Sequence, residues 1–143
     1  MTIYVDTSVL VAYYCPEPLS ETAERHIRAL DLPMLSRLTE VEFQSALAKK
    51  VRRKELTEED AQRIGQLFRR HREQELYHVV PVQEGAYRQA REWMTRRSTA
   101  LRTLDALHLA TADRRGVRVL TADTIMARAG EPLEVPVQLL KVE

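Results

Sequence analysis

The sequence predicts an α/β protein in which helices cover a central, mainly parallel sheet. Short runs of β-branched and aromatic residues alternate along the chain with segments whose apolar residues recur at helical spacing. This alternation is typical of parallel sheets, because each parallel connection has to cross back over the sheet, usually as a helix. The 143 residues, of which 44% are hydrophobic, match the size and the core of one domain. We therefore expect a single domain over residues 1–143.

The first 51 residues are expected to form two strands and three helices. Residues 2–6 are β-branched and aromatic, which predicts a buried strand, and the helix expected at residues 7–14 has to end before the two prolines that follow it. Residues 20–30 begin with a serine suited to the N-cap and continue with apolar residues at helical spacing. Residues 33–35 are a candidate second strand. Residues 38–51 are apolar nearly all round, so we expect a well-buried helix there.

Residues 57–75 carry the strongest helical pattern of the chain. Thr57 and Asp60 resemble a capping box at the start. Four residues spaced three or four apart form one stripe: Ala61, Ile64, Phe68 and His71. We interpret this stripe as core packing or a dimer surface.

The alternation continues to the end of the chain. Residues 77–82 are a candidate strand, residues 83–97 and 103–115 are candidate helices, and Gly116 follows the second helix where a left-handed terminator is common. The remaining elements are expected as a strand at 117–120, a short helix at 123–129 and a strand at 135–139.

Composition excludes several classes of protein. The 22 basic and 21 acidic residues give a net charge of +1, which excludes a histone-like polycation. Cys15 is the one cysteine, so neither an internal disulfide nor a cysteine-based zinc site can form. The chain has four glycines, and no glycine-rich phosphate loop follows the first strand. No apolar run spans a bilayer and no signal peptide begins the chain, so we expect a cytoplasmic protein without membrane contact.

Two acids stand at expected strand ends, within otherwise apolar surroundings. Asp6 closes the first strand in IYVDTSVLVA, and Asp123 follows a later strand in VRVLTADTIMA. In open α/β sheets, ligands collect beyond the carboxyl ends of the strands, so these two acids could converge if their strands are neighbours. Either acid could instead cap the helix that follows it.

Two further acids lie on expected helices. Asp105, in LRTLDALHLATA, has Leu101 and Leu109 four residues away on either side, which places it on an inward stripe. Glu42, in LTEVEFQSALAKK, cannot share a role with Glu40, which lies about 200° around the helix. Asp105 could instead pair with a buried arginine, and Glu42 could be a half-exposed surface acid.

Several inward carboxylates together predict a bound cation. They repel one another and lose hydration, so burying them without a counter-ion is costly. A hard divalent cation with oxygen ligands is a suitable counter-ion, and it can also activate water for hydrolysis.

Four blocks of this sequence, in order, resemble the PIN-domain ribonucleases, and most of all the VapC toxins of bacterial and archaeal toxin–antitoxin pairs. The blocks are IYVDTSVLVA, TEVEFQSAL, LRTLDALHLATA and VLTADTIMA, and the resemblance runs from Ile3 to Ala127. It implies a PIN-like α/β/α sandwich and an endoribonuclease that hydrolyses RNA phosphodiester bonds with one or two Mg²⁺ or Mn²⁺ ions. It also implies a homodimer and inhibition by a small VapB-type antitoxin, with which the chain would form a hetero-oligomer.

The resemblance also implies roles for particular residues. The acidic quartet of the family, which binds the metal and carries out catalysis, falls on Asp6, Glu42, Asp105 and Asp123. Glu42 is expected either as a ligand or as a residue that orients the metal-bound water. Three hydroxyl side chains fall where the family supports its ligands: Thr7, Ser8 and Thr121.

An acidic site repels RNA, so basic residues are expected around it. Arg96, Arg97 and Arg102 are the candidates for phosphate contacts, because they lie close to Asp105 in the sequence. The basic run at residues 52–54 is a second candidate. Each of these side chains could instead belong to an ordinary solvated face.

Two other functions remain open from the sequence. A non-catalytic PIN-fold protein that binds RNA or protein could carry the same acids. A phospho-aspartyl phosphotransferase would use Asp6 as its nucleophile, but Ser8 stands where enzymes of the haloacid-dehalogenase type place a second Asp. His108 is expected in the core or in a dimer contact, because Mg²⁺ prefers oxygen ligands.

Overall fold

The computed structural model describes residues 2–142, and its strands form one parallel sheet in the order β3-β2-β1-β4-β5. The strands are β1 (Ile3–Val5), β2 (Met34–Ser36), β3 (His78–Val80), β4 (Arg118–Thr121) and β5 (Val137–Leu139). The chain proceeds outwards from β1 to β2 and β3, and then returns to the other side of β1 for β4 and β5. The strand order therefore reverses between β1 and β4. Ligands of open α/β sheets bind at such a reversal, beyond the carboxyl ends of the strands.

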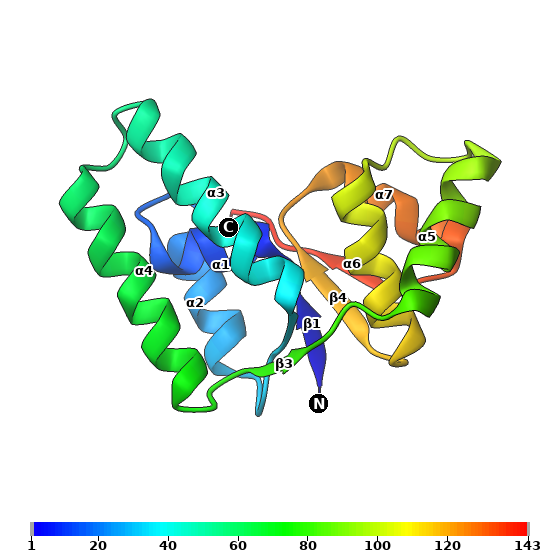
Figure 1. Ribbon diagram of the computed structural model, residues 1–143, viewed down its shortest axis with the longest axis horizontal. Coiled ribbons are helices and arrows are strands. Elements are labelled where there is room, and N and C mark those ends of the chain that lie inside the picture. The colour runs from blue at the N-terminus through cyan, green and yellow to red at the C-terminus, as the bar shows by residue number, and fades with distance from the viewer. Residues whose placement is uncertain (1, 143) are drawn as a thin grey trace.

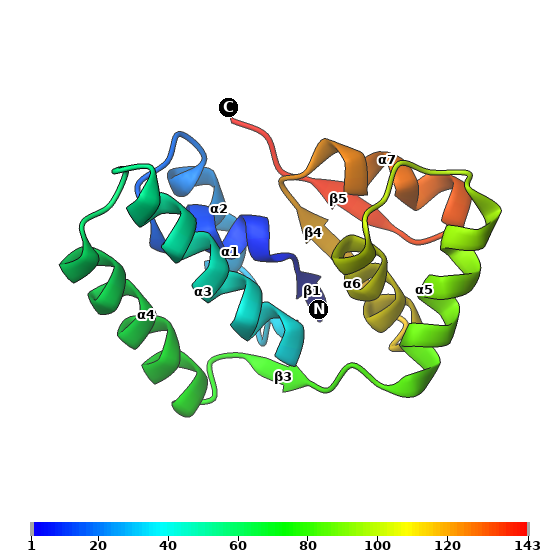
Figure 2. The same ribbon diagram turned by 45° about the horizontal axis from the view of Figure 1, so that its top comes forward.

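Helices cover both faces of the sheet, as expected for an α/β/α sandwich. They are α1 (Thr7–Tyr14), α2 (Ser20–Arg28), α3 (Arg37–Arg52), α4 (Glu58–Glu73), α5 (Glu84–Arg96), α6 (Thr103–Arg114) and α7 (Thr124–Leu133). Helices α1 to α4 lie together on one side of the sheet, and α5 to α7 lie on the other (Figures 1 and 2). Each group closes its own apolar core against the sheet.

The strands are short and apolar because both of their faces are buried. Side chains alternate between the faces of a strand, so Ile3 and Val5 pack into the core under α1 to α4, whereas Tyr4 packs into the core under α5 to α7. Leu35 and Met34 divide in the same way on β2. Continuous apolar strands are typical of parallel sheets that helices cover on both sides.

The expected elements are all present, and three local expectations are wrong. Ser20 is not the N-cap of α2: that position belongs to Leu19, and the Ser20 hydroxyl accepts from the N–H of Glu17 (2.9 Å) and donates to the carbonyl of Cys15 (2.7 Å). It therefore closes the turn before the helix. Helix α3 is buried along one face only, because α1 and α4 contact it while its other face borders the site described below.

The third difference is the end of α7, which continues past residue 129 to Leu133. Gly130 makes this possible, because a Cβ there would lie 2.7 Å from the carbonyl oxygen of Val135. The missing side chain lets the chain turn tightly behind the helix and enter β5. Gly116 is confirmed as the left-handed residue after α6, with φ of +67°.

The stripe on α4 is confirmed as core packing. Phe68 is fully buried, and its ring centroid lies 4.4 Å from that of Phe43 on α3. Thr57 caps the helix by accepting the N–H of Asp60 at 3.0 Å. His71 continues the stripe, with Nδ1 2.6 Å from the hydroxyl of Tyr14.

No helix within residues 2–142 combines the length and the hydropathy that a membrane crossing requires. Cys15 is a buried free thiol, and burial raises its pKa to about 11.

We expect Phe68→Ala to lower the free energy of unfolding by about 3–5 kcal/mol, because it leaves a cavity between the rings of Phe43 and Tyr77. Leu67→Ala on the same helix is the control, since Leu67 is 36% exposed, and we expect a change of about 0.5 kcal/mol. Urea unfolding of both variants measures the difference. Equal losses would show that α4 is not anchored through Phe68.

Candidate active site

Asp6 lies at the carboxyl end of β1, beside β4, and only 5% of it is exposed. Its N–H donates to the carbonyl of Leu120 (2.9 Å), which continues the pairing of the two strands. Its carboxylate does not cap α1. Instead, Oδ2 accepts from the hydroxyls of Ser8 (2.6 Å) and Thr121 (2.9 Å). The structure thus brings two of the predicted supporting hydroxyls onto the first acid.

Asp123 lies two residues beyond β4 and caps α7. Its Oδ1 accepts from the backbone N–H groups of Ile125 (2.8 Å) and Met126 (3.4 Å). Its own N–H donates to Thr121 Oγ1 (3.0 Å), the hydroxyl that also contacts Asp6. The capping interpretation is therefore correct for Asp123, and the cap holds its carboxylate next to the end of β4.

Glu42 projects from α3 towards the same edge of the sheet, and 20% of its side chain is exposed. Oε1 accepts from Thr7 Oγ1 (2.7 Å) and also contacts Nε2 of His108. Glu42 is partly exposed, as the alternative interpretation has it, but these two contacts tie its carboxylate to the site and not to an ordinary surface. Glu40 points elsewhere, as expected, and forms an ion pair with Arg37 (2.9 Å).

Asp105 lies half-buried in the first turn of α6. Burial raises its pKa, and the negative charges of Asp6 and Asp123 raise it further; a hydrogen bond with the backbone of Arg102 and the nearby His108 counteract this only in part. These three carboxylates therefore share one electrostatic environment. No arginine among the described residues forms an ion pair with Asp105, so it is not the partner of a buried arginine.

His108 is fully buried, as expected for a core residue, and it also contacts the site. Its Nε2 meets Oε1 of Glu42 and lies 4.0 Å from Oδ1 of Asp6. Its Nδ1 lies 2.5 Å from the hydroxyl of Tyr4, which donates to Oγ of Ser36 (2.8 Å). The structure thus links the acidic site to the interior of the sheet.

The pKa of His108 is raised and that of Glu42 is lowered, as expected for an ion pair. Burial alone lowers the pKa of His108, but the hydrogen bond with Glu42 and the charges of Asp6 and Glu42 raise it overall. Burial alone raises the pKa of Glu42, but His108 and the Thr7 hydroxyl lower it overall. Both shifts favour the charged forms.

A hollow of about 760 Å³ opens beside Glu42 and Asp105, between α3 and residues 101–105. Arg102 and Lys49 are its basic lining residues. Arg96 and Arg97 do not line it: Arg96 pairs with Glu92 (3.4 Å), and the Arg97 guanidinium donates to the carbonyl of Thr95 (3.0 Å).

An adjoining hollow of about 650 Å³ reaches Thr7 and Ser8 along α3. Its apolar lining includes Leu38, Val41 and Leu104, of which Val41 is 69% exposed. The acidic site is thus bordered by a basic surface and by an apolar one.

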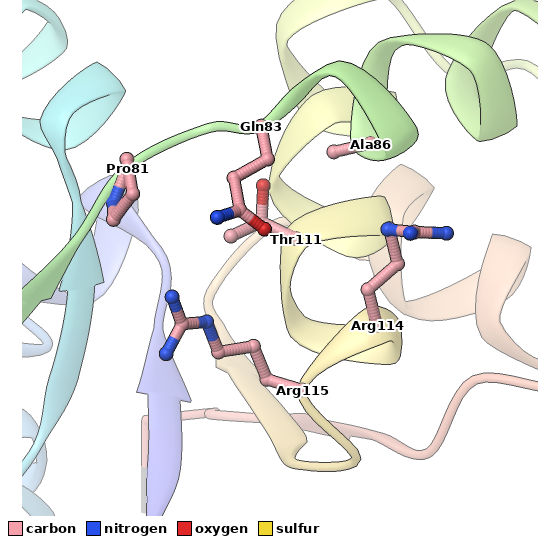
Figure 3. A pocket seen from close by; sticks show the side chains of 6 residues that line it. All are labelled: Pro81, Gln83, Ala86, Thr111, Arg114 and Arg115. Atoms are coloured by element: carbon pink, nitrogen blue, oxygen red, sulfur yellow. The ribbon is translucent and has the colours of Figure 1, made fainter.

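A separate hollow of about 400 Å³ lies beside the other end of α6 (Figure 3). Its lining residues are Pro81, Gln83, Ala86, Thr111, Arg114 and Arg115. None of them is a carboxylate, so this hollow offers no anionic ligand for a hard cation.

The predicted quartet meets at one edge of the sheet without enclosing a metal position. Within residues 2–142, no three His, Cys, Asp or Glu side chains converge closely enough to hold a metal ion. Separate hydrogen-bond partners hold Asp6, Glu42 and Asp123 individually. As a set of carboxylate oxygens, however, the quartet has the chemistry that Mg²⁺ and Mn²⁺ prefer.

Three residues near the site were not assigned to it from the sequence. Tyr4 lies two residues before Asp6, so strand alternation places both on one face. His108 lies three residues after Asp105 on the same helix, and Lys49 lies seven after Glu42. These spacings can be read from the sequence, but the hydrogen-bond partners of Tyr4 and His108 lie on other elements.

Comparisons with known proteins agree with this architecture. The family model of the PIN domain matches residues 3–132. No curated protein matches the chain significantly. The fold is similar to Mycobacterium tuberculosis VapC20, described as a Sarcin-Ricin loop cleaving toxin, with 23% identity, coverage of 90% of this chain and 95% of that chain, and a TM-score of 0.72.

Two further solved structures have similar folds. FitAcB from Neisseria gonorrhoeae has 22% identity, coverage of 96% of both chains and a TM-score of 0.68. VapBC2 from Rickettsia felis, bound to a DNA fragment from its promoter, has 11% identity, coverage of 99% of this chain and 100% of that chain, and a TM-score of 0.73. At these identities the likeness concerns the fold.

We expect Asp105→Asn to stabilise the chain at pH 7 in the presence of EDTA. Because the pKa of Asp105 is raised, the folded state holds more protons than the unfolded state between the ordinary value, about 3.9, and the raised one. The free energy of unfolding therefore falls as the pH rises through that window, and the Asn variant lacks this fall.

Urea unfolding across this pH range measures the effect, with Glu131→Gln as the control for loss of an exposed carboxylate on α7. An Asn variant that is no more stable than wild type at pH 7 would contradict the repulsion among the three acids.

Proposed function

The chain belongs to the PIN-domain family, and we propose that it is a metal-dependent endoribonuclease that hydrolyses RNA phosphodiester bonds. One observation carries the proposal. Asp6, Asp105 and Asp123 lie near enough at the reversal of strand order for the first and last to raise the pKa of the second. Like charges gathered at a site without a paired arginine are relieved by a divalent cation.

Asp6, Asp105 and Asp123 would hold the metal, and Glu42 would act either as a further ligand or by orienting water. Bound Mg²⁺ or Mn²⁺, as one or two ions, would lower the pKa of a water molecule and stabilise charge on the leaving oxygen. Ser8 and Thr121 hold Asp6 by donating to Oδ2, and Thr7 holds Glu42 by donating to Oε1. Such supporting contacts fix the orientation of ligands. Attack by water leaves 5′-phosphate and 3′-hydroxyl ends.

RNA would approach through the hollow between α3 and residues 101–105. Arg102 and Lys49 line it, and they offset the repulsion between the carboxylates and the phosphates. Arg96 and Arg97 lie just before this segment and would contact phosphates further along the strand. The exposed run at residues 52–54 follows α3 and is the more remote candidate.

We propose further that the chain is the toxin of a type II toxin–antitoxin pair. Structures with similar folds include a toxin–antitoxin complex from Klebsiella pneumoniae and DNA-bound VapBC from Salmonella typhimurium. The apolar hollow lined by Leu38, Val41 and Leu104 would receive a small antitoxin beside the acidic site. A homodimer, alone or within a hetero-oligomer with the antitoxin, belongs to the same proposal.

A non-catalytic binding protein is the second candidate. It is favoured by the absence, within residues 2–142, of three acidic, His or Cys side chains that enclose a metal position. Metal binding and cleavage separate the two functions.

We expect purified protein to cut a labelled structured RNA with Mg²⁺ or Mn²⁺ and not with EDTA. Asp6→Asn and Asp105→Asn should each reduce cleavage by more than the roughly 10–100-fold typical of residues that only support ligands. Asp113→Asn, on the same helix as Asp105 but bonded to Gln89, should cut like wild type.

Cleavage in EDTA, or products with 2′,3′-cyclic phosphate, would contradict hydrolysis by metal-activated water. The non-catalytic function would be favoured if wild-type protein binds RNA, binds no Mn²⁺ and yields no cleavage product.

We expect the double charge reversal Arg97→Glu with Arg102→Glu to weaken RNA binding most at low salt. Each lost phosphate contact should reduce the slope of log K against log salt concentration by roughly 0.7. Fluorescence anisotropy in EDTA measures binding without cleavage. Arg63→Glu with Arg69→Glu on the outer face of α4 is the matched control, and equal effects of the two pairs would place the RNA elsewhere.

A further inference from the structure

A chain of buried hydrogen bonds crosses the carboxyl edge of the sheet and ends on Glu42. It runs from Ser36 to Tyr4 (2.8 Å), from Tyr4 to Nδ1 of His108 (2.5 Å), and from Nε2 of His108 to Oε1 of Glu42. Ser36, Tyr4 and His108 are each 0% exposed. Because α6 and α3 lie on opposite faces of the sheet, this chain joins the two layers directly at the acidic site.

The imidazole of His108 is fixed at both nitrogens. The Tyr4 hydroxyl has one proton, which it donates to Ser36, so its oxygen faces Nδ1 as an acceptor. The carboxylate of Glu42 faces Nε2 as the second acceptor. The ring cannot turn without leaving buried polar groups unpaired, which is costly.

The same contact determines which oxygen of Glu42 remains open. A carboxylate oxygen has two lone pairs, and Oε1 receives both Thr7 Oγ1 and His108 Nε2. Asp6 is held in the same manner, since Oδ2 receives both Ser8 and Thr121, while Oδ1 lies 4.0 Å from Nε2 of His108. Among residues 2–142, each acid thus has one oxygen that accepts hydrogen bonds from the protein and one that accepts none.

We propose that Tyr4 and His108 are positioning residues that hold Glu42 so that Oε2 alone is offered to a divalent cation or to its water. This inference rests on the proposed function and assigns two residues to that site. If His108 only filled the core, it would need no contact with the carboxylate of Glu42. The Tyr4 hydroxyl would likewise need no contact with His108. Tyr4 and His108 thus hold Glu42, a residue of α3, from the opposite face of the sheet.

Tyr4→Phe is the principal test, because it removes the hydroxyl and keeps the ring in the core. The control is Tyr77→Phe, which also loses a buried hydroxyl contact, with Tyr14 at 2.7 Å, in the other core. In metal-free protein we expect the Nε2–H proton of His108, followed by NMR, to exchange with water at least about tenfold faster in Tyr4→Phe than in wild type and Tyr77→Phe.

Binding of Mn²⁺, measured by calorimetry without RNA, should weaken by about 10–100-fold in Tyr4→Phe, with no change in Tyr77→Phe. The KM for RNA should stay the same while kcat falls. His108→Gln, whose amide can still donate to Oε1, should keep more Mn²⁺ affinity than His108→Leu.

Equal proton exchange and equal Mn²⁺ affinity in Tyr4→Phe and Tyr77→Phe would overturn the positioning role. So would His108→Leu binding Mn²⁺ as well as His108→Gln. Failure of the proposed function gives a different result: wild type then binds no Mn²⁺ and cuts no RNA. In that case the NMR comparison alone decides whether Tyr4 holds the ring on Glu42.

Discussion

The repulsion among carboxylates at the carboxyl edge of β1 and β4 is the constraint around which the site is built. Asp6 and Asp123 raise the pKa of the half-buried Asp105, so this edge can keep its charged carboxylates only where other groups stabilise them. Hydroxyls hold Asp6, the N-terminus of α7 holds Asp123, and His108 with Thr7 holds Glu42. The surrounding donors thus maintain a concentration of negative charge that the apolar core could not tolerate.

The order of the parallel strands brings the acids and the groups that hold them to one edge of the sheet. The reversal between β1 and β4 sets the end of each strand beside the other, and Thr121 contacts both Asp6 and the backbone of Asp123. Helices on the two faces then supply the remaining acids, Glu42 from α3 and Asp105 from α6. Neither layer contains a complete site by itself, and His108 is the direct connection between them at this edge.

The sequence allowed the elements and their types to be predicted, because strands buried on both faces are continuously apolar and the helices keep a regular spacing. It also placed Asp6 and Asp123 at strand ends, whereas the pairing of these two strands as neighbours is a finding of the structure. The one-sided burial of α3 and the end of α7 at Leu133 depend on contacts with other segments, and local pattern does not contain them. The link from Tyr4 through His108 to Glu42 was not predicted for the same reason: its members come from three elements, and only tertiary packing brings them together.

The bond between Thr121 and Asp6 joins residues 115 positions apart. A ribosome makes the N-terminal residues first, so Asp6 exists long before its neighbour strand. Until β4 has emerged, β1 has no partner on that side, Asp6 lacks Thr121, and Asp123 has not been made. A nascent chain therefore contains the acids of its first half without the edge at which the four acids meet. The order of synthesis therefore leaves an unfinished chain without the assembled edge until β4 has been made.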